Sequence, residues 1–145
     1  MLFLGGPSYA HIVSATNTGV AITVQGSNLV TADIATQNDA LLFDVSELKD
    51  GVSGMIYHKS TGLVANVNGG FTTEGTEVIV YEKVPDYAGE TWTYRDGRIY
   101  SALTGFAMEM HSDGHIVMMP HSNDLSQLWS FKPFGKSYTG FKINF

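Results

Sequence analysis

The sequence predicts a single all-β domain that contains three copies of one short pattern. Three observations predict it: the composition suits short strands, one turn sequence recurs at a constant spacing, and apolar residues alternate after each turn. The chain has 145 residues, which is the usual size of a domain with one hydrophobic core. We therefore expect residues 1–145 to fold as one unit.

The composition disfavours long helices on the surface. Charged residues make up 15% of the chain, hydrophobic residues make up 43%, and there are 16 glycines. Such a chain is poor material for surface helices and good material for strands joined by tight turns.

A Thr-Gly pair recurs at a constant interval. Thr18-Gly19, Thr61-Gly62 and Thr104-Gly105 follow one another at steps of 43 residues. Val13, Ile56 and Ile99 keep the same step just upstream of each pair. Two landmarks with one spacing indicate an internal repeat.

Apolar residues alternate after each Thr-Gly pair, which is typical of a strand with one buried face. The three stripes are Val20, Ile22 and Val24; Leu63, Ala65 and Val67; and Phe106, Met108 and Met110. Each copy ends on a pair of large apolar residues, which we also expect in the core: Phe43 and Val45, Trp92 and Tyr94, Trp129 and Phe131.

These landmarks divide the chain into repeats of about four strands at residues 8–50, 51–94 and 95–132. Six extra residues fall in 46–53 of the first copy, and six fall in the second copy before its Trp92, around 71–76. The aromatic tail at 133–145 is expected to pack on the barrel or on a second subunit. Repeated short strands favour a closed barrel, because closure removes unpaired edges.

Charge and composition disfavour several classes of partner. The net charge is −6 and the basic residues are scattered, so we expect no binding to nucleic acid. Cysteine is absent, which excludes disulfides and thiolate chemistry. No segment has the length of a membrane span, and the first ten residues do not read as a signal peptide, so we expect no membrane insertion and a cytoplasmic location.

Over about residues 8–132, the sequence resembles the ricin-B-chain-like (R-type) lectins, which are β-trefoil carbohydrate-binding modules. Gln127-Leu128-Trp129 matches the Gln-X-Trp signature of that family, Glu90-Thr91-Trp92 is a near match, and Leu41-Leu42-Phe43 is a degenerate one. The lack of cysteine is more similar to small fungal cytosolic members than to secreted toxins. The resemblance implies a β-trefoil with three pseudo-symmetric repeats.

The resemblance also implies where sugar pockets would lie. The acidic or amide position falls on Thr23, Asn66 and Glu109; the aromatic platform falls near Asp33, Tyr81 and Met119; the polar position before the Trp falls on Ala40, Gly89 and Ser126. The alternation of apolar residues independently predicts that Thr23, Asn66 and Glu109 point away from the core. A sugar needs such a mixture, because its hydroxyls pair with polar groups while one face of its ring packs on an aromatic ring.

We therefore expect the first pocket to be lost, the second to be best preserved and the third to be altered. In the second, Asn66 and Tyr81 are the main candidates, and Lys83, Asp86 and Tyr87 are expected to reach over the site. In the third, Glu109 is expected to accept hydroxyls, with His121 and Asn123 in part replacing the platform.

Other chemistry has weaker support in the sequence. His111, His115 and His121 with Glu109 invite a metal site, but Ser112-Asp113-Gly114 reads as a turn, so we expect surface or pocket histidines, no metal and no cofactor. No carboxylate pair suits glycoside hydrolysis, and there is no nucleophile elbow or phosphate loop, so we expect no enzyme.

The sequence-based interpretation is a non-catalytic lectin for galactose-type or related sugars on glycoproteins or glycolipids, with several sites or a homodimer adding strength. Two alternatives stay open. One is a β-trefoil protease inhibitor or protein-interaction module that uses the loops at 46–53 and 71–76. The other is an accessory subunit of a larger assembly.

Overall fold

The computed structural model describes residues 6–36 and 38–134, which form strands joined by turns and short 3-10 helices. The strands are β1 (Tyr9–Ser14), β2 (Val20–Gln25), β3 (Asn28–Asp33), β4 (Leu42–Asp44), β5 (Tyr57–His58), β6 (Val64–Val67), β7 (Val78–Tyr81), β8 (Trp92–Arg95), β9 (Arg98–Ser101), β10 (Ala107–Met110), β11 (Ile116–Met119) and β12 (Trp129–Pro133). The 3-10 helices are η1 (Ile34–Thr36), η2 (Asp39–Leu41), η3 (Ser46–Gly51), η4 (Asn68–Gly70), η5 (Ala88–Glu90) and η6 (Leu125–Gln127). The predicted all-β class is confirmed.

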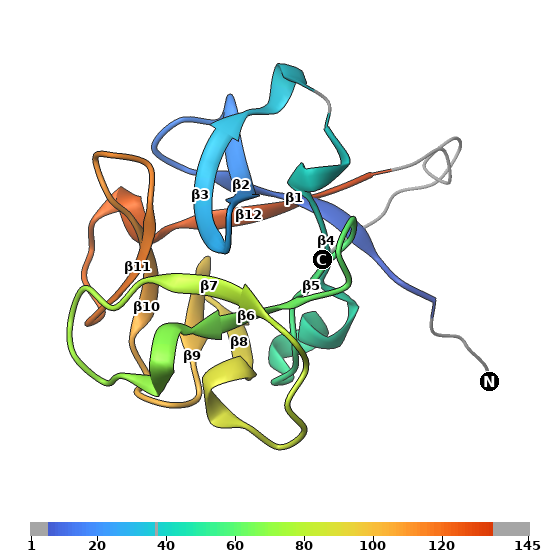
Figure 1. Cartoon of the computed structure of the whole chain (residues 1–145). Coiled ribbons are helices and arrows are strands. Elements are labelled where there is room, and N and C mark those ends of the chain that lie inside the picture. Colours follow the sequence, from blue (N-terminus) through green and yellow to red (C-terminus); the bar gives the residue numbers. More distant parts are fainter. Residues whose placement is uncertain (1–5, 37, 135–145) are drawn as a thin grey trace.

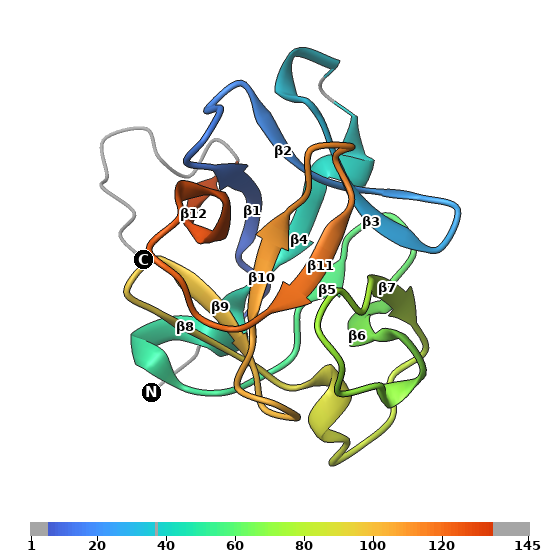
Figure 2. The same cartoon turned by 90° about the vertical axis from the view of Figure 1, so that its left-hand side faces the viewer.

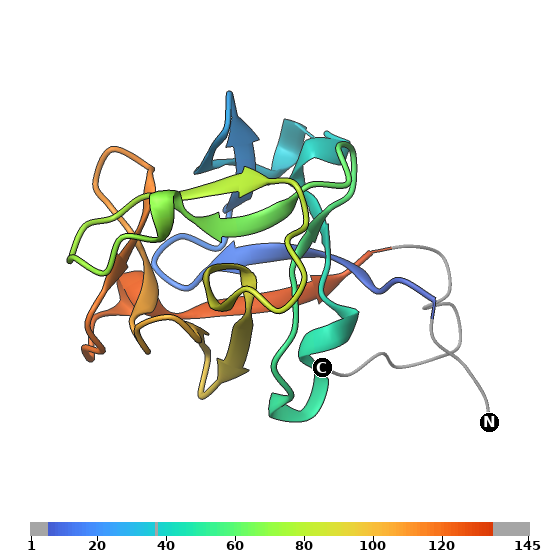
Figure 3. The ribbon, with the colours of Figure 1, turned by 60° about the horizontal axis from the view of Figure 1, so that its bottom comes forward.

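Six strands form a barrel. β1 pairs with β12 and with β4, β4 pairs with β5, and β8 pairs with β9. The bridge between Gly54 and Trp92 joins the strands on one side, and the amide of Trp129 donates to the carbonyl of Gly97 at 2.8 Å on another. Figure 3 shows β1 and β12 side by side along the length of the molecule.

The other six strands form three hairpins, β2–β3, β6–β7 and β10–β11, which surround one end of the barrel (Figure 1). Figure 2 turns the β10–β11 hairpin toward the viewer. The hairpins also pair with one another, and each junction uses the same two positions of the repeat. The residue pairs are Asn28 with Ile79, Glu77 with Val117, and His115 with Val30.

Main-chain hydrogen bonds at these junctions follow the same three-fold rule. The amides of Thr31, Val80 and Met118 donate to the carbonyls of Gly114, Ser27 and Thr76, at 2.9, 2.8 and 2.8 Å. The three hairpins therefore close into a ring of equivalent contacts. Together with the barrel, this ring gives the predicted β-trefoil architecture. The strands fall four to each repeat, although β8 and β12 each end one residue beyond the expected limits at 94 and 132.

The core confirms most of the predicted inward positions. Ile22, Ala65 and Met108 are fully buried and belong to one cluster, together with Phe43, Trp92 and Trp129. The indole N–H of Trp92 donates to the carbonyl of Ala65, and that of Trp129 donates to the carbonyl of Met108, both at 3.1 Å. Both tryptophans are thus core residues whose polar atoms are satisfied.

One predicted landmark is wrong by one residue. Val13 packs with Ala21 and Leu41 in a small separate cluster, whereas Ile12 lies in the main core with Ile56 and Ile99. The cause is the first turn, where the paired residues Val13 and Ala21 are eight positions apart, against seven in the other two copies. Gly19 accordingly lacks the positive φ that Gly62 and Gly105 share, at 73° and 78°.

Both predicted insertions lie in connections and leave the strands in phase. Residues 46–51 form η3, whose Leu48 is buried in the core. The second insertion lengthens the β6–β7 connection: Asn66 and its partner Ile79 are 13 positions apart, against seven and eight for the equivalent pairs. Main-chain connections of this kind tolerate added length at low cost.

Two expectations concern the ends and the surroundings of the chain. The expected packing of the aromatic tail falls on residues 135–145, which lie outside the described part, although Phe134 makes an edge contact with His11. Within residues 6–36 and 38–134 there is no helix of the length and apolar character that a membrane crossing requires.

Candidate functional site

The second repeat contains a hollow with a volume of about 420 Å³ at the outer face of the β6–β7 hairpin. We call it the second-repeat pocket. It is lined by Asn66, Asn68, Gly69, Gly70, Ile79, Tyr81, Val84 and Tyr87. Its size lies within the range of about 300–1,000 Å³ that is usual for small-molecule sites. Its lining combines apolar and aromatic side chains with two amides and no carboxylate.

Asn66 lies at the base of this pocket and is oriented by Glu90. The Asn66 side chain is 6% exposed, and its Nδ2 donates to Oε2 of the fully buried Glu90 at 2.9 Å. The other carboxylate oxygen of Glu90 accepts the main-chain N–H of Val84 at 2.6 Å. An ionised carboxylate can accept hydrogen bonds but cannot donate them. The Asn66 side chain therefore turns its amide nitrogen inward, toward Glu90. Oδ1 of Asn66 has no hydrogen-bond partner among the described residues, and Asn66 belongs to the pocket lining.

Two tyrosines form the walls of the pocket. Tyr81 is the last residue of β7 and is 50% exposed, so it is accessible to a ligand in the pocket. Tyr87 lies against two glycines: a Cβ at Gly89 would lie 2.5 Å from Cζ of Tyr87, and a Cβ at Gly70 would lie 2.6 Å from its hydroxyl oxygen. The ring of Tyr87 therefore occupies the space that a side chain at position 89 would need.

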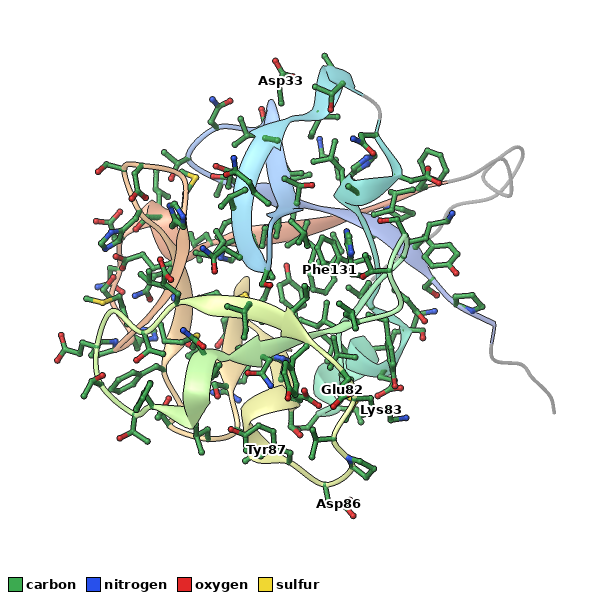
Figure 4. All side chains as sticks on the ribbon, in the orientation of Figure 1. Asp33, Glu82, Lys83, Asp86, Tyr87 and Phe131 are labelled. Carbon is green, nitrogen blue, oxygen red and sulfur yellow. The ribbon has the colours of Figure 1, made fainter. Side chains whose placement is uncertain are left out.

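The structure brings Asn66, Tyr81 and Tyr87 together but places Lys83 and Asp86 outside the pocket lining. Lys83 packs over the ring of Tyr57, with its Nζ 5.8 Å from the ring centroid. Asp86 has a positive φ of 59° and lies at the tip of its loop, pointing away from the molecule (Figure 4). Neither residue reaches over the site, contrary to expectation, because Lys83 packs on Tyr57 and Asp86 points away from the molecule.

The third repeat has the same pair of positions with the chemical roles exchanged. Glu109 stands where Asn66 stands, and Gln127 stands where Glu90 stands. Nε2 of Gln127 donates to Oε1 of Glu109 at 3.1 Å and to the carbonyl of Pro120 at 2.8 Å, while its Oε1 accepts the N–H of Ser122 at 2.9 Å. Here the carboxylate is the outer member of the pair.

The residues expected to complete the third site lie elsewhere. Nδ1 of His121 is 2.9 Å from the hydroxyl of Tyr100, and the two rings lie parallel. His121 is thus equivalent to Lys83, since each packs on a tyrosine of the barrel. Asn123 is exposed on the following loop. Glu109, His121 and Asn123 are absent from the lining of the neighbouring hollow of about 410 Å³ between the first and third repeats.

The first repeat lacks the polar pair. Thr23 donates from its hydroxyl to the carbonyl of Ala40 at 2.9 Å, and the apolar Leu41 takes the place of Glu90 and Gln127. The strand register also corrects the platform position, because Ala21 pairs with Ala32, as Val64 pairs with Tyr81. The residue equivalent to Tyr81 is thus Ala32, and the exposed Asp33 follows it in the sequence.

Sequence reasoning missed Asn68, Ile79, Val84 and the role of Glu90. Asn68 could have been found, because it lies two residues after Asn66 and alternation places both on one face. The contact of Glu90 with the main chain of Val84 has no signal in the sequence, since it depends on how the loop between them closes.

The described residues contain no group of three or more histidines, aspartates or glutamates that could hold a metal ion. His111 and His115 lie at the two ends of the β10–β11 turn, where the N–H of His111 donates to the carbonyl of His115 at 2.8 Å. Nδ1 of His115 is 3.3 Å from Oδ1 of Asp113. These histidines belong to a hairpin turn, as expected.

Comparison with known proteins identifies the fold. No protein-family profile matches the sequence, and no curated protein matches it significantly. Among solved structures, the Polyporus squamosus lectin bound to Neu5Acα2-6Galβ1-4GlcNAc has a TM-score of 0.78 and 19% identity over 89% of this chain. The chain spans 50% of the length of that lectin.

Two other structures match along nearly their whole length. The designed three-fold symmetric protein ThreeFoil has a TM-score of 0.75 at 17% identity, with 86% of this chain and 97% of that chain covered. The C-terminal half of the earthworm R-type lectin, in complex with GalNAc, has a TM-score of 0.69 at 13% identity, with 88% and 100% covered. At these identities the likeness establishes architecture. With the ring of equivalent contacts between its hairpins, the chain is a β-trefoil.

Proposed function

We propose that this protein is a lectin that binds a neutral, galactose-type or related sugar, without catalysis, in the second-repeat pocket. The observation that carries the proposal is the orientation of Asn66. Glu90 holds its Nδ2, so the base of the pocket presents a carbonyl oxygen to a ligand that donates hydrogen bonds. Sugar hydroxyls are such donors.

The walls of the pocket suit the other half of a sugar. Tyr81, Tyr87, Ile79 and Val84 offer flat or apolar surface against which one face of a pyranose ring sheds water. Three of the solved structures with this fold have sugar ligands or lectin names, which supports the same class of ligand.

The pocket offers little for hydrolysis. Its lining has no carboxylate, and Glu90 beneath it is fully buried with both oxygens engaged. Glycoside hydrolysis needs two carboxylates that flank one bond. We therefore propose reversible recognition of glycans on glycoproteins or glycolipids, with no cofactor.

Calorimetry and a glycan array test the proposal directly. Tyr81→Ala should abolish measurable binding of galactose-type sugars while the variant keeps the melting temperature of the folded wild type within a few degrees. Asn66→Ala should abolish binding too, with a lower melting temperature, because the buried Glu90 loses a hydrogen-bond donor. Leu125→Ala is a matched control, because Leu125 is exposed but lies in the third repeat. Folded wild-type protein that binds no glycan on the array would refute the proposal.

A single open pocket binds weakly, so the proposal includes a homodimer in which two pockets act together on one surface. Light scattering after size-exclusion chromatography measures the oligomeric state directly. A monomer at the concentration used for binding would refute the proposed homodimer. A cytoplasmic location is also proposed, and fractionation of cells that express the protein tests it.

A second candidate function has its own observation. The two inserted segments carry the two most exposed large apolar side chains of the described residues, Val52 and Phe71. Exposed apolar groups on loops are typical of protein-binding edges. A panel of cysteine and serine proteases tests inhibition: loss of inhibition on replacing residues 71–76, with none on Asn66→Ala, would favour this function over sugar binding.

A further inference from the structure

The insertion in the β6–β7 connection brings an aromatic ring to the edge of the second-repeat pocket. Phe71 is 62% exposed. Its ring lies directly against Gly69, which lines the pocket: a Cβ at Gly69 would lie 2.6 Å from Cε2 of Phe71. Gly69 also has a φ of 66°, so both its conformation and this contact require glycine.

The loop that carries Phe71 is fixed at both ends. The N–H of Phe71 donates to the carbonyl of Asn68 at 3.3 Å. At the far end, the N–H of Gly75 donates to the carbonyl of Met118, and the N–H of Met118 donates to the carbonyl of Thr76, both at 2.8 Å. These bonds restrain the main chain on both sides of Phe71, which lowers the entropic cost of ordering the loop on binding.

Apolar side chains gather around this pocket. The large apolar residues that are exposed in the described part are Val52, Phe71, Tyr81, Val84, Leu125 and Phe134. Tyr81 and Val84 line the pocket, and Phe71 adjoins it. Asn68, which lies between Asn66 and Phe71 along the chain, has a side-chain amide with no hydrogen-bond partner among the described residues. The loop thus adds an aromatic ring beside Asn68, the amide at the edge of the pocket lining.

We infer that Phe71 and Asn68 form a second subsite and that the extended site takes a disaccharide or longer neutral glycan. This inference rests on the proposed function. One sugar residue occupies the pocket between Tyr81 and Tyr87, and the residue linked to it packs one face on Phe71 and pairs a hydroxyl with Asn68. The first and third repeats have short hairpin turns at this place, so only the second repeat has the subsite.

Calorimetry on wild type, Phe71→Ala and Leu125→Ala tests this, with galactose, N-acetylgalactosamine, lactose and N-acetyllactosamine as probes. Wild type should bind the better disaccharide at least tenfold more tightly than the monosaccharides. Phe71→Ala should weaken disaccharide binding by about three- to tenfold, the usual range for one aromatic contact, and change monosaccharide binding by less than twofold. Leu125→Ala should change neither.

The outcomes separate the two proposals. Wild type that binds none of the four sugars and no glycan on an array refutes the proposed function and the subsite with it. Monosaccharide binding that depends on Asn66, with equal effects of Phe71→Ala on monosaccharides and disaccharides or with no effect on either, refutes the subsite alone. Loss of protease inhibition in Phe71→Ala, with unchanged sugar affinities, assigns the ring to a protein partner and also refutes the subsite.

Discussion

The second and third repeats share a frame and differ at the surface. In each, the indole N–H of the tryptophan donates to the strand that carries the outward polar residue, at 3.1 Å in both cases. Above that frame, the second repeat has an amide held by a buried carboxylate, and the third has a carboxylate held by a buried amide. The frame of these two repeats therefore fixes two interacting positions without fixing which of them is the carboxylate and which is the amide.

The exchange has a consequence for recognition. A carboxylate at the surface, as in the third repeat, attracts hydrogen-bond donors strongly and repels anionic ligands. The amide oxygen of Asn66 accepts hydrogen bonds more weakly than a carboxylate and carries no net charge of its own. The platform differs as well, because the second repeat has Tyr81 where the third has Met119.

The largest expected effect tests the shared frame. Trp92→Ala and Trp129→Ala should each lower the free energy of unfolding by about 3–5 kcal/mol, because each removes a buried aromatic side chain and leaves a carbonyl without its donor. Urea denaturation measures both. If the loss in free energy of unfolding for one variant were less than about half of the loss for the other, the two frames would not be equivalent.

The next effect tests the exchanged pair. Asn66→Asp puts a second carboxylate against the buried Glu90 and should cost about 1–3 kcal/mol of stability. Adding Glu90→Gln should recover most of that loss, since it reproduces the arrangement of Glu109 and Gln127, in which the glutamine oxygen accepts a main-chain N–H. A denaturation cycle over the four proteins gives the coupling. Additive costs would mean that the two side chains do not interact.

A smaller effect tests the pocket wall. Gly89→Ala places a Cβ in the space of the Tyr87 ring and should weaken sugar binding by about tenfold through displacement of that ring. Ser126→Ala, at the equivalent position of the third repeat, should change sugar affinity by less than twofold. Calorimetry on both measures the difference. Equal losses would place the binding site elsewhere.

The smallest effect concerns pH and the turn of the second repeat. Burial lowers the pKa of His58, whose ring nitrogens contact the Thr61 hydroxyl at 2.8 Å and the Ala40 carbonyl at 2.9 Å. The unfolded chain therefore binds the proton more readily, and stability should fall as the pH drops below about 6.5. Thermal melts from pH 8 to 5 should be flatter for His58→Gln than for wild type. Burial also lowers the pKa of His11, with a smaller contribution from the charge of Lys132, and because this side chain is only half-buried, His11→Gln should flatten the melts less.

Much of the fold was readable because spacing and alternation report on strands directly. The Thr-Gly pairs, most residues of the apolar stripes and both tryptophans lie where the sequence places them, although Val20 belongs to neither core cluster. Val13 is misassigned, because one extra residue in the first turn is invisible to a count of equal steps. In the pocket, Asn66, Tyr81 and Tyr87 could be predicted from the strand pattern and the resemblance. Lys83 and His121 could not, since their packing on Tyr57 and Tyr100 depends on where loops turn.

The contacts that join the three hairpins are hydrogen bonds between peptide groups, and peptide groups are the same in every residue except proline. These junctions therefore place little demand on side-chain identity, and each repeat can carry different side chains while the same junction forms. The first repeat lacks the polar pair and the second has a long loop with a phenylalanine, and the ring of hairpins is closed in spite of both differences.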